Sequence, residues 1–236
     1  NVSLGSQTTG ANGIYSINGL PGCQPYTFSP YRNDAPLNGV STWDLVLISK
    51  HILNLEPLNS PYKLIAADAN KSNSVTTFDI VSIRRIILGI DTAFTSNTSW
   101  RFVPTDFQFP NLANPFQTPF PETLDVQLQT LPLDDLDFTA IKVGDVNNSV
   151  TPSLTAQIEE RTGGEWPLFL QNVDFEKNKN ATAVFSGKMT NTAGAQFTLQ
   201  FDTQKLVLEK IEPLLPGLST GNFGTNRSTD GLLTVS

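Results

Sequence analysis

The sequence predicts a mainly β fold with a small α-helical insert, in which β-sandwich modules are joined by a pair of loop-helix units. Its outer parts alternate apolar and polar residues between turn residues, as half-buried strands do. The part between them repeats itself and carries apolar residues at helical spacing. The composition agrees, because 16 Gly and 16 Pro in 236 residues favour turns while 15 Phe can fill cores.

These patterns divide the chain into four expected regions. Residues 1–30 would end a β-sandwich, 31–90 would form the loop-helix module, 91–150 a flap rich in Pro and Phe packed on it, and 151–236 an incomplete second sandwich. Cys23 is the only cysteine, so no disulfide can form within the sequence. We expect it to be a small buried apolar residue.

The first region shows alternation between residues 10 and 30. Tyr15 and Ile17 share one face of an expected strand, and Tyr26 and Phe28 share one face of a second strand. Glycine and proline between them signal turns. We therefore expect a hairpin here.

The second region is a duplication at an offset of 35 residues. The offset aligns Asp44 with Asp79 and Ile48 with Ile83, among other identical pairs. Each copy reads as a loop followed by a helix. Two apolar stripes recur at helical spacing and should pack on each other: Leu45, Ile48, Ile52 and Leu55 in the first copy, and Ile80, Ile83, Ile87 and Ile90 in the second. A short helix over 60–67, begun by Ser60 and Pro61, should link the copies, and Gly89 should end the last helix in a left-handed cap.

The loop of the second copy has the spacing of a calcium site. Alternate residues of such a loop turn inward, and a carboxylate at position 12 closes the shell. Every side chain offered is a hard oxygen donor, which suits calcium better than zinc or copper. Only two are carboxylates, so we expect a weak site with a Kd of about 10⁻⁴ to 10⁻³ M. The residues at positions 1, 3, 5, 7, 9 and 12 are Asp68, Asn70, Ser72, Ser74, Thr76 and Asp79. Asn73 stands where glycine is usual, and asparagine tolerates the left-handed backbone needed there.

The loop of the first copy is shorter by one residue. Its expected calcium ligands are Asp34, Asn38, Ser41 and Asp44, with carbonyl groups or water completing the shell. An alternative reading needs no metal in either copy. Ser41 with Asp44 and Thr76 with Asp79 also have the spacing of a helix capping box. That box does not explain the alternation of Asp68, Asn70 and Ser72.

The third region interleaves proline with phenylalanine, which excludes long helices and central strands. We expect an irregular flap whose Phe side chains lie over the helix pair. Near its end, Asp145 and Asn147 resemble the opening of another calcium loop, but no acid follows at position 12. A simple turn is the interpretation we favour. In the fourth region, strands are expected within 181–187, 195–201, 205–211 and 232–235.

The paired loops and helices resemble a type I dockerin domain. The resemblance covers residues 33–90 and includes the valine at loop position 8 and the basic residues Lys50 and Arg85, six places after each closing aspartate. It departs from the family at Trp43 and Phe78, where dockerins carry small hydroxyl residues used in partner recognition. The first region is similar to a collagen-adhesin B or prealbumin-like sandwich, and the fourth to a cohesin. This order resembles large secreted surface proteins of Bacteroidota.

Catalysis is not expected, because one His, one Cys and no nucleophile or phosphate-loop motif leave little convergent chemistry. A net charge of −7 argues against nucleic acid. No apolar run is long enough to span a membrane.

The resemblance implies an extracellular, cell-surface segment in which calcium stiffens the junction between neighbouring modules of a longer chain. The alternative is a cohesin-dockerin docking module of an extracellular polysaccharide-degrading complex. A flap covering the face of Lys50 and Arg85 would exclude that alternative. Bundling of identical chains and glycan binding by a sandwich are further partner hypotheses.

Overall fold

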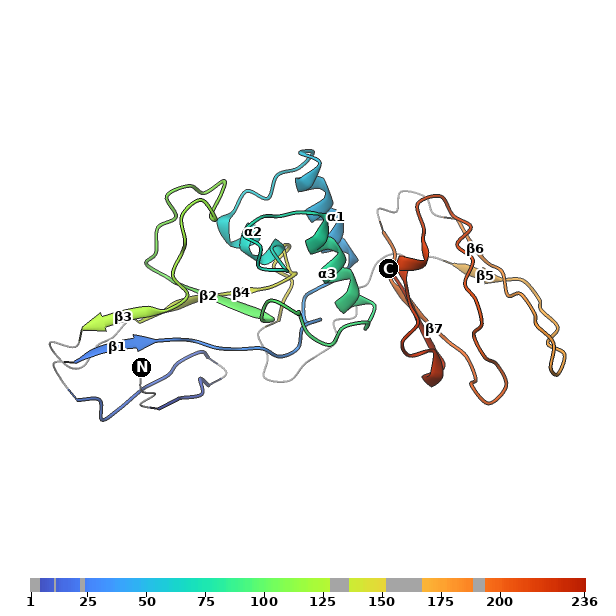
Figure 1. Cartoon of the computed structure of the whole chain (residues 1–236), viewed down its shortest axis with the longest axis horizontal. Coiled ribbons are helices and arrows are strands. Elements are labelled where there is room, and N and C mark those ends of the chain that lie inside the picture. The colour runs from blue at the N-terminus through green and yellow to red at the C-terminus, as the bar shows by residue number, and fades with distance from the viewer. Residues whose placement is uncertain (1–4, 11, 22–23, 128–135, 152–166, 189–193) are drawn as a thin grey trace.

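The computed structural model describes residues 5–10, 12–21, 24–127, 136–151, 167–188 and 194–236. Cys23 therefore lies outside the described residues. Within them the chain has a mixed fold of three α-helices and four small antiparallel sheets (Figure 1). None of the described helices has the length and apolar character that crossing a bilayer requires.

The helices follow the duplicated segment. Helix α1 spans Thr42–Ile52, α2 spans Pro61–Ala67 and α3 spans Thr77–Ile87. Both expected capping boxes form, at Ser41 before α1 and at Thr76 before α3. Gly89 has φ +68°, which confirms the predicted left-handed end of α3.

Helices α1 and α3 pack on each other through their apolar faces, as predicted. Ile48 and Ile83 are fully buried in one core, and Ile65 of α2 lies there with them. Burying a side chain of this size contributes about 1.5–3 kcal/mol. The prediction that Leu55 continues the stripe is wrong: α1 ends at Ile52, the chain turns through Asn54 at φ +56°, and Leu55 is 73% exposed.

Two long-range strand pairs support the helices. Strand β2 (Trp100–Pro104) pairs with β4 (Phe138–Lys142), and β4 also contacts α2. Strand β1 (Pro25–Phe28) pairs with β3 (Leu124–Gln127) rather than with residues 12–21, which contain no strand. The predicted hairpin is therefore wrong. Gly13 and Gly19, both at φ +76°, interrupt the extended backbone that its first strand would need.

The segment between β2 and β3 is irregular, and its aromatic side chains cover part of the helical core. Phe109 meets Tyr62 of α2 edge to face at 5.5 Å and Phe107 at 5.0 Å between ring centroids. Phe116 and Phe120 also pack against this core. The flap thus lies over α2.

The C-terminal part forms two separate small sheets. One pairs β5 (Leu168–Leu170) with β6 (Phe185–Gly187), and the other has the order β7-β9-β8. Strands β7, β8 and β9 span Phe197–Gln200, Phe223–Gly224 and Leu232–Val235, with 3₁₀ turns at Thr220–Asn222 and Ser228–Asp230. The strand expected over 205–211 is absent from these described residues, and the sandwich is not confirmed.

The sheet β7-β9-β8 lies against the helix pair (Figure 1). The Thr234 hydroxyl donates to the Leu88 carbonyl at 2.8 Å, next to the end of α3. The Thr42 and Ser236 hydroxyls are hydrogen-bonded at 2.8 Å at the start of α1. A Cβ atom on Gly224 would lie 2.3 Å from the Leu88 oxygen, so only glycine allows this close approach. The helix pair and this sheet therefore share a tight contact.

Candidate functional site: an oxygen-lined loop between two helices

The candidate site is the loop that joins α2 to α3. Asp68 is the C-cap residue of α2, and Thr76 is the N-cap of α3. Both carboxylates of the loop, Asp68 and Asp79, are fully buried. The two helices thus hold the two ends of the loop and bring its acidic residues inside.

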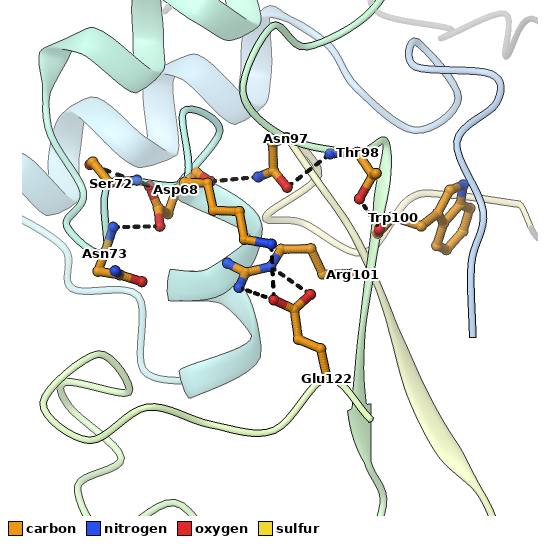
Figure 2. A network of polar contacts seen from close by, with 9 residues as sticks. Asp68, Ser72, Asn73, Asn97, Thr98, Trp100, Arg101 and Glu122 are labelled. Atoms are coloured by element: carbon orange, nitrogen blue, oxygen red, sulfur yellow. Dashed lines mark hydrogen bonds and ion pairs between the residues drawn. The ribbon is translucent and has the colours of Figure 1, made fainter. Parts of the chain in front are cut away.

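Asp68 organises the first half of the loop. Its Oδ1 accepts from the Ser72 amide at 2.8 Å, and its Oδ2 accepts from the Asn73 amide at 2.9 Å (Figure 2). The Asn70 side-chain oxygen accepts from the same Ser72 amide at 3.0 Å. Positions 1, 3 and 5 of the predicted calcium loop therefore turn toward one another.

Asp79 closes the second half. Its Oδ2 accepts from the amide of Thr76 at 2.8 Å and from the Thr76 hydroxyl at 3.1 Å, which is the capping box. Its Oδ1 accepts from the Asn70 amide at 3.1 Å, on the far side of the loop. A cap alone requires only the first set of bonds, so Asp79 serves as helix cap and loop closure together.

The remaining predicted positions lie in the same network. The Ser72 hydroxyl lies 3.2 Å from the Ser74 carbonyl oxygen and 3.1 Å from the Ser74 hydroxyl. Asn73 has φ +62°, as its identity predicted. Lys71 has φ +57°, a left-handed conformation that its residue type does not indicate. All six residues proposed for this loop are thus linked by hydrogen bonds.

The electrostatics of the loop favour a cation. Burial raises the pKa of Asp68, and the nearby charge of Asp79 raises it further, whereas bonds from the Ser72 and Asn73 amides lower it. Two buried carboxylates in proximity repel each other unless a positive charge lies between them or one takes up a proton.

A second network ties the loop to the flap (Figure 2). Glu122 accepts from Arg101 at 2.7 Å and pairs with Lys71 at 3.1 Å, so it bridges strand β2 and the loop. The Asn97 amide nitrogen donates to the Asp68 carbonyl at 3.1 Å. Arg101 is buried, and its charge lowers the pKa of Asp68. The loop is therefore held by side chains from outside the duplication.

The first-copy residues are arranged differently from the expectation. The Ser41 amide and hydroxyl donate to Asp44 Oδ2 at 2.9 and 3.0 Å, which matches the second copy. Asn38 donates to the Thr151 carbonyl at 2.9 Å. Asp34, with its side chain 58% exposed, pairs with Arg32 at 2.6 Å, and the structure does not bring it into the group around Asp44.

The residue that approaches Asp44 is Asp145, where the sequence predicted a simple turn. The Val146 amide donates to Asp44 Oδ1 at 3.0 Å across 102 residues, and Asp145 itself is only 3% exposed. One sequence pattern could have identified Asp145 as a site residue. The spacing of Asp145, Asn147 and Ser149 repeats that of Asp68, Asn70 and Ser72.

The donor set of the Asp68–Asp79 loop fits calcium. It offers carboxylate, amide, hydroxyl and carbonyl oxygens, which calcium accepts at flexible geometry. Among the described residues, no three Asp, Glu, His or Cys side chains gather as a candidate metal group. With two carboxylates per loop, the neutral oxygens and water would have to complete the shell, so the affinity should be modest.

Comparison with known proteins adds no assignment. No family model, curated protein or solved structure matches this chain. The resemblance to dockerins therefore stays a prediction based on the residues quoted above.

Proposed function

We propose that this chain is a non-catalytic structural segment of a large secreted surface or filament protein, in which calcium stiffens the junction between modules. The observation that carries the proposal is the oxygen-lined loop between α2 and α3, with the buried carboxylates of Asp68 and Asp79 at its two ends. The absence of metal would leave two inward carboxylates opposed to each other.

Calcium would act by neutralising this pair and fixing the angle between the helices. A ligand that binds only the folded chain stabilises it by RT ln(1 + [L]/Kd). With a Kd of about 10⁻⁴ to 10⁻³ M, calcium at about 1 mM would contribute about 0.4–1.4 kcal/mol. The proposal is therefore consistent with a cell-surface location.

The junction in question is the contact of the sheet β7-β9-β8 with the helix pair. Leu88, directly after α3, accepts a hydrogen bond from Thr234. Thr42, the first residue of α1, is hydrogen-bonded to Ser236 after β9. Any change in the packing of α1 against α3 would move the two halves of this contact apart. Calcium can thus control a surface that its ligands do not touch.

The experiment is backbone ¹⁵N relaxation of the whole chain with calcium and with chelator. In calcium, amides of α3 and β9 should report one common tumbling time, and chelation should give β9 a shorter one. Thr234→Val, which removes the bond to Leu88, should weaken the coupling in calcium, whereas Thr198→Val on the exposed face of β7 should not. Identical relaxation in both conditions would contradict the proposal.

Docking of a separate partner is the second candidate function, because apolar side chains of α1 and α3 are exposed on the surface. Phe78 is 73% exposed, and Val81 and Trp43 are also exposed. Lys50 pairs with Glu56, and Arg85 pairs with Asp91 at the surface. The described flap aromatics pack toward α2 and the core, so they do not exclude docking here.

Sedimentation equilibrium in calcium tests the version in which identical chains bundle. A monomer-dimer equilibrium weakened by Phe78→Ser, with Phe175→Ser as the exposed control, would support it. A monomer at all concentrations would remove it. Glycan binding is tested by calorimetric titration with soluble polysaccharides, and absence of heat would remove that hypothesis.

A further inference from the structure

A second loop with the same arrangement is assembled from two distant segments. Its first half begins at Asp145, directly after β4 and the turn at Gly144. The amide of Gly144 donates to the Ala66 carbonyl at 2.8 Å, so the chain enters this loop hydrogen-bonded to the segment that enters the Asp68 loop.

The first half repeats the contacts of Asp68. Asp145 Oδ1 accepts from the Ser149 amide at 3.2 Å, and Oδ2 accepts from the Val150 amide at 2.8 Å. Asn147 accepts from the Ser149 amide at 2.9 Å, as Asn70 does from Ser72. The fourth residue of both loops is left-handed, with φ +59° at Asn148 and +57° at Lys71.

The second half is supplied by residues 39–44. The Ser149 hydroxyl donates to the Gly39 carbonyl at 2.9 Å, as the Ser72 hydroxyl does to the Ser74 carbonyl at 3.2 Å. Gly39 precedes Asp44 by five residues, and Ser74 precedes Asp79 by five. Gly39 and Asp44 therefore occupy loop positions 7 and 12, and Asp44 supplies the closing acid that the sequence after Val150 lacks.

Gly39 is required where the two segments meet. It has φ +76°, and a Cβ atom there would lie 2.6 Å from Val150 Cα and 2.8 Å from Asp145 Oδ2. The absence of a side chain leaves its carbonyl and the Asp145 carboxylate in one small oxygen-lined space.

An observation separate from the loop geometry points to a cation. Asp44 and Asp145 are 0% and 3% exposed, and within the described part of the chain neither has an ion-pair partner. Burial raises the pKa of both carboxyl groups, and Asp145 raises that of Asp44. Lys142 interacts electrostatically with Asp145 and Asp44. Its ammonium group, however, donates hydrogen bonds to the carbonyls of Pro36 at 2.8 Å and Val143 at 3.4 Å. Two buried negative charges thus lack a direct counter-charge.

We propose that this split loop binds a second calcium ion through Asp145, Asn147, Ser149, Asp44 and the carbonyl oxygen of Gly39. The inference rests on the proposed calcium function and extends it to a site that joins segments 102 residues apart. Its role differs from that of the Asp68 loop, because it fastens the end of β4 to the start of α1.

The test is calorimetric titration of the whole chain with calcium chloride. The wild type should bind two ions, and Asp145→Asn and Asp68→Asn should each bind one. Asp34→Asn is the matched control, since it changes the acid that sequence spacing assigned to the first loop, and it should still bind two. Lys142→Met should also bind two, whereas a gain of the second site only in this variant would show that Lys142 is the native counter-charge and would overturn the proposal.

Amide chemical shifts of the wild type give a second readout that does not depend on a folded variant. Calcium should move the signals of Ser149 and Val150 together with those of Ser72 and Asn73. Saturable shifts at Ser72 and Asn73 alone would overturn the split site and leave the proposed function standing. Shifts in neither loop would overturn both.

Discussion

The two oxygen-lined loops make nearly the same hydrogen bonds, but one is continuous in sequence and the other is not. In the loop of Asp68 and Asp79 the twelve positions are consecutive residues. In the loop of Asp145 and Asp44, residues 145–150 supply the first half and residues 39–44 complete the ring. The continuous loop can form locally, whereas the split loop exists only when β4 and α1 have already come together.

The difference has a thermodynamic consequence. An ion in the continuous loop restrains a short segment, and an ion in the split loop closes a segment of 102 residues. The entropy lost on closing a loop grows with its length, although only logarithmically. Binding at the split loop should therefore depend more strongly on global folding than binding at the continuous loop.

The largest expected effect comes from position 7, where the loops differ most. Gly39→Ala should destabilise the chain by about 3 kcal/mol, because overpacking costs about 1–3 kcal/mol and a left-handed non-glycine residue adds about 1–2. The equivalent Ser74→Ala sits on the surface and should cost well under 1 kcal/mol. Chemical denaturation measures both, and similar losses in the two variants would contradict the split geometry.

Acidification should affect both loops next. The raised pKa values of Asp44, Asp68 and Asp145 mean that the folded metal-free chain binds more protons than the unfolded chain between the ordinary carboxyl pKa and the raised ones. Stability of that form therefore falls as pH rises through this window, by up to about 1.4 kcal/mol per pH unit for each group.

Calcium binds the ionised carboxylates, so its affinity should fall as pH falls into the same window. Each loop contains at least one buried carboxyl group with a raised pKa, so amide shifts should show both loops releasing calcium as the pH falls. Calcium shifts that do not change across this window would count against this account.

The smallest effect concerns the shared left-handed fourth position. Asn148→Ala should cost about 1 kcal/mol, because alanine tolerates φ +59° less well than asparagine. Lys71→Gly should be close to neutral, since relief of backbone strain offsets loss of the Lys71–Glu122 pair, which is worth about 0–1 kcal/mol. Urea midpoints of the two variants check the comparison, and a loss at Lys71 as large as at Asn148 would contradict it.

Local features of the sequence predicted the helical part well. The apolar period marked α1 and α3, the Ser41 and Thr76 caps marked their starts, and the alternating oxygens placed all six residues of the Asp68 loop in one network. Each of these features depends on residues within about one or two turns of each other.

Contacts between distant segments could not be predicted from the sequence in the same way. The acid that completes the loop of Asp145 lies about a hundred residues earlier in the chain, so its spacing carries no signal, and Asp34 offered a false partner at nearly the right distance. The hairpin failed for the same reason, because β1 pairs with β3 rather than with its sequence neighbour. Alternation indicates an extended segment but does not identify the strand beside it.

The central claim is that calcium neutralises carboxylates buried at the ends of the helices and so stabilises the chain. Thermal unfolding of the wild type and of the Asp68→Asn/Asp145→Asn double variant, each with excess calcium and with chelator, tests it most directly. Calcium should raise the Tm of the wild type clearly and leave that of the double variant unchanged. A wild-type Tm that is the same in calcium and in chelator would contradict the account.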